Sequence, residues 1–346
     1  MKTPAQTIPE QIKLYCARIG ADALLVQGAG GNISWKEDSI LWIKASGTCL
    51  AEADKKDIFV AVDLKDLRLN ITRKEFYKTP KIINDSHLKP SIETLLHALM
   101  PHKVVVHLHA VEILSHLVRE NPFEIFNRLI GNSINWCCVN YYKPGAELAE
   151  AVMTELVKHE DINVVFLLNH GVVIGGENIE EIDFILQKII SLLKNFIATP
   201  PINNKSDDSS STLILKKGYR LCSDKEINYL ATNINLSSRL ENEWVLFPDH
   251  AIFLGENAAI LGKTINLKDL DLSAKRNPPF IFEIGKGVYE NKMVTTSQKQ
   301  QLRCYYNVLV RQPANLKLRS LTSHQVLELI NCDAEKYRRF IHLNEI

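Results

Sequence analysis

Two spacings of apolar residues alternate along the first 200 residues of the chain. Short apolar runs with the period of a strand predict strands at 33–35, 40–45, 59–63, 104–109, 136–140, 164–168 and 172–174. Apolar residues at helical spacing predict helices over 7–19, 91–99, 111–120, 146–160 and 179–197. Because the strands are short and end at glycine-rich corners, we expect an α/β fold with a mixed or antiparallel sheet flanked by helices, not a doubly wound parallel sheet.

A break in this pattern lies at residues 198–212, where prolines, asparagines, aspartates and serines replace the apolar positions. Such a composition buries too little apolar surface to order itself, so it predicts a linker between a domain at 1–197 and a second at 213–346. The second domain is expected to be a smaller α+β accessory unit. Its pattern predicts helices within 223–240, over 297–310 and over 323–342, and a strand pair within 279–294 that turns at Gly285-Lys286-Gly287.

Composition narrows the classes of partner. The 41 basic and 40 acidic residues are well mixed, which argues against a nucleic-acid partner. No apolar run is long enough for a bilayer and no signal peptide is evident, so we expect a cytoplasmic protein with no membrane partner. Seven cysteines without a C-x-x-C pair indicate reduced thiols in place of disulfides or a cysteine zinc site.

The chemistry-bearing residues begin with His107 and His109, which follow the apolar run Val104-Val105-Val106. Two residues apart on a strand, their imidazoles project from one face, where they could hold a metal ion or be buried histidines bonded to the backbone. His170 ends a second apolar run and adds a third imidazole. Three nitrogen ligands with an open position are typical of a catalytic zinc site.

Glu93 lies in Pro-Ser-Ile-Glu-Thr, which predicts a helix that begins at Ser91. The carboxylate could stabilise the first turn of that helix, or it could act as a general base beside the metal if the helix N-terminus faces the histidines.

Three polar corners could receive a phosphate. Gly28-Ala29-Gly30-Gly31-Asn32 is a tight glycine segment before a strand, Ala45-Ser46-Gly47-Thr48 is a second, and Ser91 is a third. Glycines bring backbone N–H groups close to an anion, although the first segment could equally be a turn with positive φ.

The segments Gly-Gly-Asn-Ile-Ser, Lys-Ala-Ser-Gly-Thr, Ser-Ile-Glu-Thr-Leu-Leu-His-Ala-Leu-Met-Pro-His-Lys, His-Leu-His-Ala and Asn-His-Gly occur in this order. Over about residues 10 to 197 the chain therefore resembles the class II aldolase/adducin family. It looks closest to the rhamnulose-1-phosphate aldolase part of bifunctional aldolase/alcohol dehydrogenases, and the second domain is similar to the segment that follows that part. The resemblance implies a mostly antiparallel central sheet and a homo-oligomer, such as a tetramer.

The resemblance also implies roles for particular residues. His107, His109 and His170 would bind Zn²⁺ or another divalent metal, and Glu93 would be the catalytic acid/base. Gly31, Asn32, Ser46, Gly47 and Ser91 would bind the phosphate of a small-molecule sugar phosphate. One departure is Ile92, which stands where fuculose-phosphate aldolases have a second serine.

The expected reaction is retro-aldol cleavage of a phosphorylated ketose of the rhamnulose- or fuculose-1-phosphate type. The alternatives are a pentulose-phosphate 4-epimerase or a sugar-phosphate dehydratase with the same metal site, and a non-catalytic adducin-like interaction module. A second acid or base would be a tyrosine, with Tyr141, Tyr142, Tyr289, Tyr305 and Tyr306 as candidates; His250 is expected to be structural.

Overall fold

The computed structural model describes residues 9–159, 161–194, 212–270 and 277–343. Contacts divide the chain into two compact units. The first comprises Met1–Leu117 with Asn121–Lys194, and the second comprises Val118–Glu120 with Asn195–Ile346. Apart from Thr212, the predicted linker lies outside the described residues.

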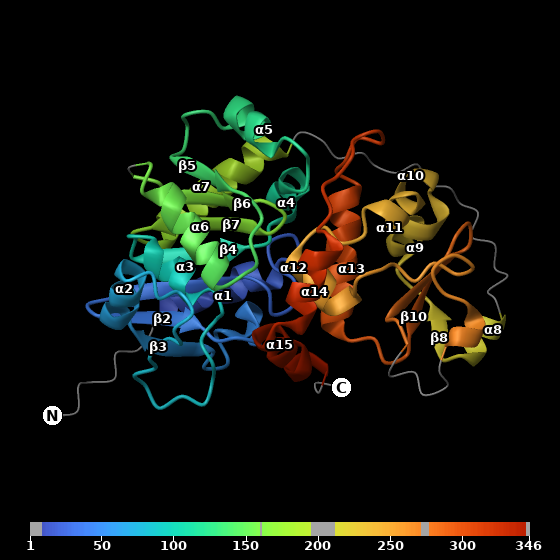
Figure 1. Ribbon diagram of the computed structural model, residues 1–346, viewed down its shortest axis with the longest axis horizontal. Helices are drawn as coiled ribbons and strands as arrows, with labels where there is room; N and C mark the ends of the chain where they lie inside the picture. Colours follow the sequence, from blue (N-terminus) through green and yellow to red (C-terminus); the bar gives the residue numbers. More distant parts are fainter. Residues whose placement is uncertain (1–8, 160, 195–211, 271–276, 344–346) are drawn as a thin grey trace. The chain divides into compact units, whose positions relative to one another are not determined.

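The first unit is built on a seven-stranded sheet with the order β3-β2-β1-β4-β7-β6-β5 (Figure 1). Its strands are β1 Asn32–Glu37, β2 Ile40–Lys44, β3 Phe59–Asp63, β4 Val104–Leu108, β5 Trp136–Val139, β6 Val164–Leu167 and β7 Gly171–Gly176. Every neighbouring pair is antiparallel except β5 with β6. The predicted mixed α/β fold with a mostly antiparallel sheet is therefore confirmed.

Helices cover this sheet. They are α1 Glu10–Ala21, α2 Leu64–Thr72, α3 Thr94–Leu99, α4 Val111–Leu117, α5 Pro122–Leu129, α6 Ala146–Leu156 and α7 Ile179–Leu193, with a short 3-10 turn at Leu50–Glu52. Leu95 and Ala98 of α3 and Ala149 of α6 pack on Leu41 and Ile43 of β2. Leu96 of α3 and Leu148 of α6 share a second cluster with Val105, Val165 and Val173. Helices α3 and α6 thus cover one face of the sheet.

Strand alternation places the polar residues of the centre on that same face. Val105 packs under α3, so His107, two residues along β4, projects toward α3 as well. Asn32 pairs with His107 and Ser34 with Val105 across β1 and β4, which sets both polar side chains beside the histidine. The centre of the sheet therefore carries its polar residues under the start of α3.

The second unit is a smaller α+β structure. Its three-stranded antiparallel sheet has the order β8-β10-β9, formed by β8 Tyr219–Leu221, β9 Phe280–Glu283 and β10 Gly287–Asn291. The helices are α8 Thr212–Lys216, α9 Lys225–Thr232, α10 Ile234–Ser237, α11 Arg239–Asn242, α12 Pro248–Leu254, α13 Thr296–Leu309, α14 Ser323–Asn331 and α15 Asp333–Leu343, with a 3-10 turn at Leu267–Asp269. In the described parts of the chain, no helix has both the length and the apolar character needed to cross a bilayer.

Candidate metal centre

The three predicted histidines lie together at one end of adjacent strands. His107 is near the end of β4 and His109 follows that strand, whereas His170 lies in the turn that joins β6 to β7. Because β7 pairs with both β4 and β6, the sheet order brings residues far apart in the sequence into one cluster. Their ligand atoms all lie within 4.8 Å of one another, and all three side chains are buried. The Nε2 atoms of His107 and His109 are 3.1 Å apart.

The donor set of this cluster fits a divalent metal such as zinc. Nδ1 of His107 lies 3.2 Å from the carbonyl oxygen of Val172, so Nδ1–H donates there and Nε2 keeps its lone pair for a metal. The ring centroids of His107 and His170 are 4.8 Å apart, and those of His109 and His170 are 5.3 Å apart. Three convergent imidazoles leave coordination positions open, as catalytic zinc sites do.

Glu93 lies directly against this cluster. Its Oε2 is 3.5 Å from Nε2 of His107, and its Oε1 is 3.5 Å from Nε2 of His170. Oε1 is buried and has no hydrogen-bond partner among the described residues. The carboxylate therefore shares the space into which the imidazoles point.

The prediction that the helix begins at Ser91 is wrong by three residues. Helix α3 begins at Thr94, with Glu93 as the residue before its first turn. The hydroxyl of Ser91 accepts the N–H of Glu93 at 3.2 Å and its carbonyl accepts the N–H of Thr94 at 3.1 Å, so Ser91 stabilises the turn that leads into the helix. Glu93 consequently turns toward the histidines and does not cap the helix.

The electrostatics of Glu93 suit a base that is ionised at neutral pH. Burial by itself raises the pKa of this carboxyl group. His107 and His170, which are charged only when protonated, and the amide of Asn32 oppose burial, and together they lower the pKa to about 2.

The structure also draws the predicted phosphate corners together. Nδ2 of Asn32 lies 3.4 Å from Oγ of Ser91, and the N–H of Ser46 donates to the carbonyl of Lys89 at 2.8 Å. Gly31 and Gly47 both have positive φ, at 62° and 79°. A Cβ at Gly31 would lie 3.0 Å from the carbonyl oxygen of His107, so this position needs glycine for space as well as for conformation.

The side chain of Asn32 has hydrogen-bond partners on both of its polar atoms. Its Nδ2 donates to Oε2 of Glu93 at 2.8 Å, and its Oδ1 faces His97. The side-chain amide is thus engaged with the carboxylate, between the phosphate corners and the metal cluster.

Two buried residues at this site did not emerge from the sequence pattern. Lys44 donates from Nζ to the carbonyl oxygen of Ala29 at 3.0 Å, which ties the end of β2 to the glycine segment and supplies a buried cation. His97 bonds to Asn32 and Ser34. The sequence signal for Lys44 was its position two residues before Ser46, and His97 had none because it looks like one more residue of an amphipathic helix.

The candidate tyrosines divide between the two units. Tyr305 is buried in the second unit, where its hydroxyl donates to the carbonyl of Glu243 at 3.0 Å, and Tyr289 belongs to an apolar cluster of that unit. Tyr141 and Tyr142 follow β5 in the unit that holds the histidines. His250 is fully buried among Trp244, Phe247 and Tyr305, as expected for a structural histidine.

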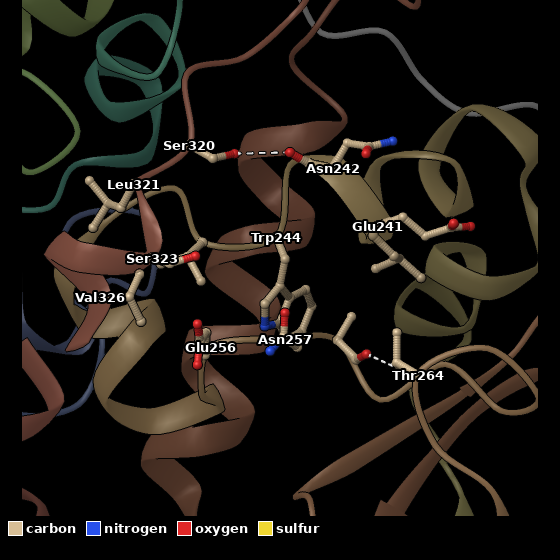
Figure 2. Close-up of a pocket in the computed structure, with 13 residues that line it drawn as sticks. Glu241, Asn242, Trp244, Glu256, Asn257, Thr264, Ser320, Leu321, Ser323 and Val326 are labelled. Carbon is tan, nitrogen blue, oxygen red and sulfur yellow. Dashed lines mark hydrogen bonds between the residues drawn. The ribbon is translucent and has the colours of Figure 1, made fainter.

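The second unit has a pocket of its own, of about 430 Å³ (Figure 2). Glu241, Glu256, Asn242 and Asn257 line it around Trp244, and no lysine or arginine is among its lining residues. Glu241 is paired with Lys263, which does not line the pocket, so the lining itself offers two carboxylates and no cation to a phosphate. The chemistry predicted from the sequence therefore belongs to the histidine cluster of the first unit.

Comparison with known proteins agrees with this geometry. Residues 12–189, just over half of the chain, match the family model described as "Class II Aldolase and Adducin N-terminal domain". The chain belongs to the class II aldolase/adducin family. The match spans the glycine segment, Glu93 and all three histidines of this family member.

Three individual relatives of this class II aldolase/adducin domain are between 15% and 32% identical to it. The "Uncharacterized oxidoreductase YuxG" of Bacillus subtilis (strain 168) is 32% identical over 192 residues, which are 51% of this chain and 27% of that protein. The chain thus spans only about a quarter of that relative's length. The N-terminal class II aldolase domain of a conserved protein from Thermoplasma acidophilum is 26% identical, with a TM-score of 0.47 over 56% of this chain and 96% of that one. An L-fuculose-1-phosphate aldolase from Thermus thermophilus is 15% identical, with a TM-score of 0.36 over 54% and 94% of the two chains.

Proposed function

We propose that this protein is a zinc-dependent aldolase that cleaves a phosphorylated ketose by retro-aldol chemistry. The observation that carries the proposal is the convergence of three buried imidazoles on a space that the Glu93 carboxylate shares, 3.5 Å from two of them. Cleavage of the bond between C3 and C4 leaves an enediolate, and a Zn²⁺ held by His107, His109 and His170 would supply Lewis-acid stabilisation of its negative charge.

Glu93 is the residue that would move a proton in this reaction. It is ionised at neutral pH, it is buried, and Asn32 holds one of its oxygens while the other faces His170. An anionic base excluded from water transfers a proton to or from the enediolate carbon efficiently when the carbon is held beside it.

The phosphate would lie at the corners formed by Gly31, Ser46, Gly47 and Ser91. Two positive-φ glycines and the Ser91 hydroxyl support this, and the buried Nζ of Lys44 adds positive charge near the glycine segment. Asn32 would contact the phosphate through its backbone, since its amide is bonded to Glu93. Several copies of this chain would assemble into a homo-oligomer.

The decisive experiment combines metal analysis with product detection on the full chain. Purified protein should contain about one zinc per chain, and one phosphorylated ketose from a panel should release dihydroxyacetone phosphate or glycolaldehyde phosphate. Substoichiometric zinc with no response to a chelator contradicts the aldolase proposal. Recovery of a C4 epimer or of a dehydrated sugar phosphate would instead assign one of the two related reactions.

Variants at two neighbouring positions separate metal binding from proton transfer. Glu93→Gln keeps the size of the side chain but removes the base, so zinc should stay bound while kcat falls about 10²- to 10⁴-fold. His107→Ala removes a ligand and should lose zinc itself. Cleavage by Glu93→Gln at the wild-type rate would show that another residue is the base.

A further inference from the structure

His97 connects the sheet to the site through hydrogen bonds at both of its ring nitrogens. The residue lies on α3, and its side chain is completely buried. Nδ1 lies 2.8 Å from Oγ of Ser34, and Nε2 is hydrogen-bonded to Oδ1 of Asn32. Ser34 and Asn32 are two residues apart on β1, so both project from the same face toward the ring.

The direction of each hydrogen bond in the series Ser34–His97–Asn32–Glu93 follows from the contact between Asn32 and Glu93. Nδ2 of Asn32 donates to Oε2 of Glu93 at 2.8 Å, and an amide nitrogen can only donate. That orientation turns Oδ1 toward His97, and the ring must therefore donate to it from Nε2. Nδ1 then accepts from the hydroxyl of Ser34. A neutral ring in the Nε2–H form satisfies both Asn32 and Ser34, and the backbone of Val105 is a further hydrogen-bond partner of the ring.

We propose that His97 is a positioning residue of the active site, whose Nε2–H sets the orientation of the Asn32 amide and thereby holds the Glu93 carboxylate against the histidine cluster. This inference rests on the proposed function, because it concerns the residue assigned there as the base. Without the ring N–H, the amide of Asn32 can rotate by 180° and present its oxygen to the carboxylate, which repels it. Glu93 has no other hydrogen bond to its side chain among the described residues to replace the one from Asn32.

The surroundings of His97 agree with this role. Burial lowers the pKa of its imidazole to about 3, so the ring is neutral at physiological pH, as a ring that donates at one nitrogen and accepts at the other must be. The alternative is that His97 only fills space under α3. Replacing His97 with a side chain of similar volume that has no N–H group distinguishes the two roles, because it preserves the packing and removes the hydrogen bond to Asn32.

The test uses two substitutions of His97 with opposite expectations. His97→Gln keeps an N–H donor near the position of Nε2, whereas His97→Leu keeps apolar volume and removes the donor. We expect His97→Leu to lower kcat about 10- to 100-fold, with KM for the ketose phosphate and bound zinc little changed. His97→Gln should recover most of the lost kcat.

A matched control separates positioning from packing. His116 is buried in the same unit, and its Nε2 bonds to the carbonyl of Leu193, away from Glu93. His116→Leu should lower the thermal midpoint without lowering kcat. Wild-type kcat in His97→Leu, or a His97→Gln variant that folds but is no more active than His97→Leu, would overturn the proposal.

A measurement without substrate keeps this inference independent of the aldolase assignment. Nitrogen-15 NMR of the histidine side chains in the full chain should show His97 as the neutral Nε2–H form, with its signal identified by its loss in His97→Gln. An Nδ1–H form or a protonated ring would refute the inference even if aldolase activity is found. Conversely, absence of zinc and of cleavage in the wild-type protein contradicts the proposed function, whatever form His97 takes.

Discussion

Gly171 lies beside the candidate metal centre, at a position with no room for a larger side chain. A Cβ at this position would lie 2.4 Å from the carbonyl oxygen of Leu108, and 3.0 and 3.1 Å from ring carbons of His107 and His109. Contacts this short force backbone or imidazoles to move. Gly171 therefore shapes the cluster without contributing a ligand.

We predict that Gly171→Ala lowers the free energy of unfolding by about 1–3 kcal/mol and weakens zinc binding, since the displaced rings no longer converge. Denaturant titration and competition with a zinc chelator measure the two effects. Gly218→Ala, in the second unit, is the control for zinc binding: a Cβ there meets no atom within 4 Å, and the φ of 85° strains only the local backbone, so stability should fall while zinc affinity stays unchanged. Unaltered zinc affinity in Gly171→Ala would show that the rings have more freedom than these contacts allow.

Among the helices and strands, periodicity identified the strands of the central sheet and most of its helices. It missed α2 and α5 in the first unit and α8, α12 and β8 in the second, all of them nine residues or shorter, which leaves little room for a period to show. It also placed the start of α3 at Ser91, three residues early: the Ser91 hydroxyl does accept the N–H of Glu93 as an N-cap would, but Ile92 and Glu93 form a turn and the helix begins at Thr94.

Helix α12 carries a prediction about pH. His250 is buried, neither of its ring nitrogens has a hydrogen-bond partner among the described residues, and burial lowers its pKa to about 3. In the unfolded chain the imidazole of His250 is protonated below about pH 6.5, whereas in the folded protein it stays neutral until the pH falls to about 3. Stability is therefore lost as the pH falls through this window, by about 1.4 kcal/mol per pH unit from this one group.

His250→Phe should remove this loss, because phenylalanine fits among Trp244, Phe247 and Tyr305 and binds no proton. The variant's advantage over wild type in the free energy of unfolding should grow as the pH falls from about 7 to about 5. Hydrogen exchange in urea, followed by mass spectrometry of peptides from α12, measures this difference in the free energy of unfolding at the helix that carries His250. An advantage that is constant with pH would refute the prediction; His324→Gln, at an exposed position, is the control.

For the molecule as a whole, the division into two units predicts that metal acts on only one of them. All three histidines belong to the first unit, and a ligand that binds only the folded state stabilises it by about 4 kcal/mol when present at about 1,000 times its dissociation constant. Removing zinc with a chelator should therefore speed hydrogen exchange in peptides from β4 and β7. Peptides from β9 and β10 should be unaffected, and equal acceleration in both sets would show that the two units unfold together.

Spacing within a few residues was enough to predict the apolar strands, the His-x-His pair on one strand face, the third histidine and the glycine corners. Which distant residues meet depended on the fold. The sheet order β1-β4-β7-β6 brings His170 to His107 and aligns Asn32 with His107, and the packing of α3 on that face sets Glu93 and His97 beside them. The partners of Asn32 and His97 could not be predicted, because the direction of a buried hydrogen bond depends on every group that the fold places around it.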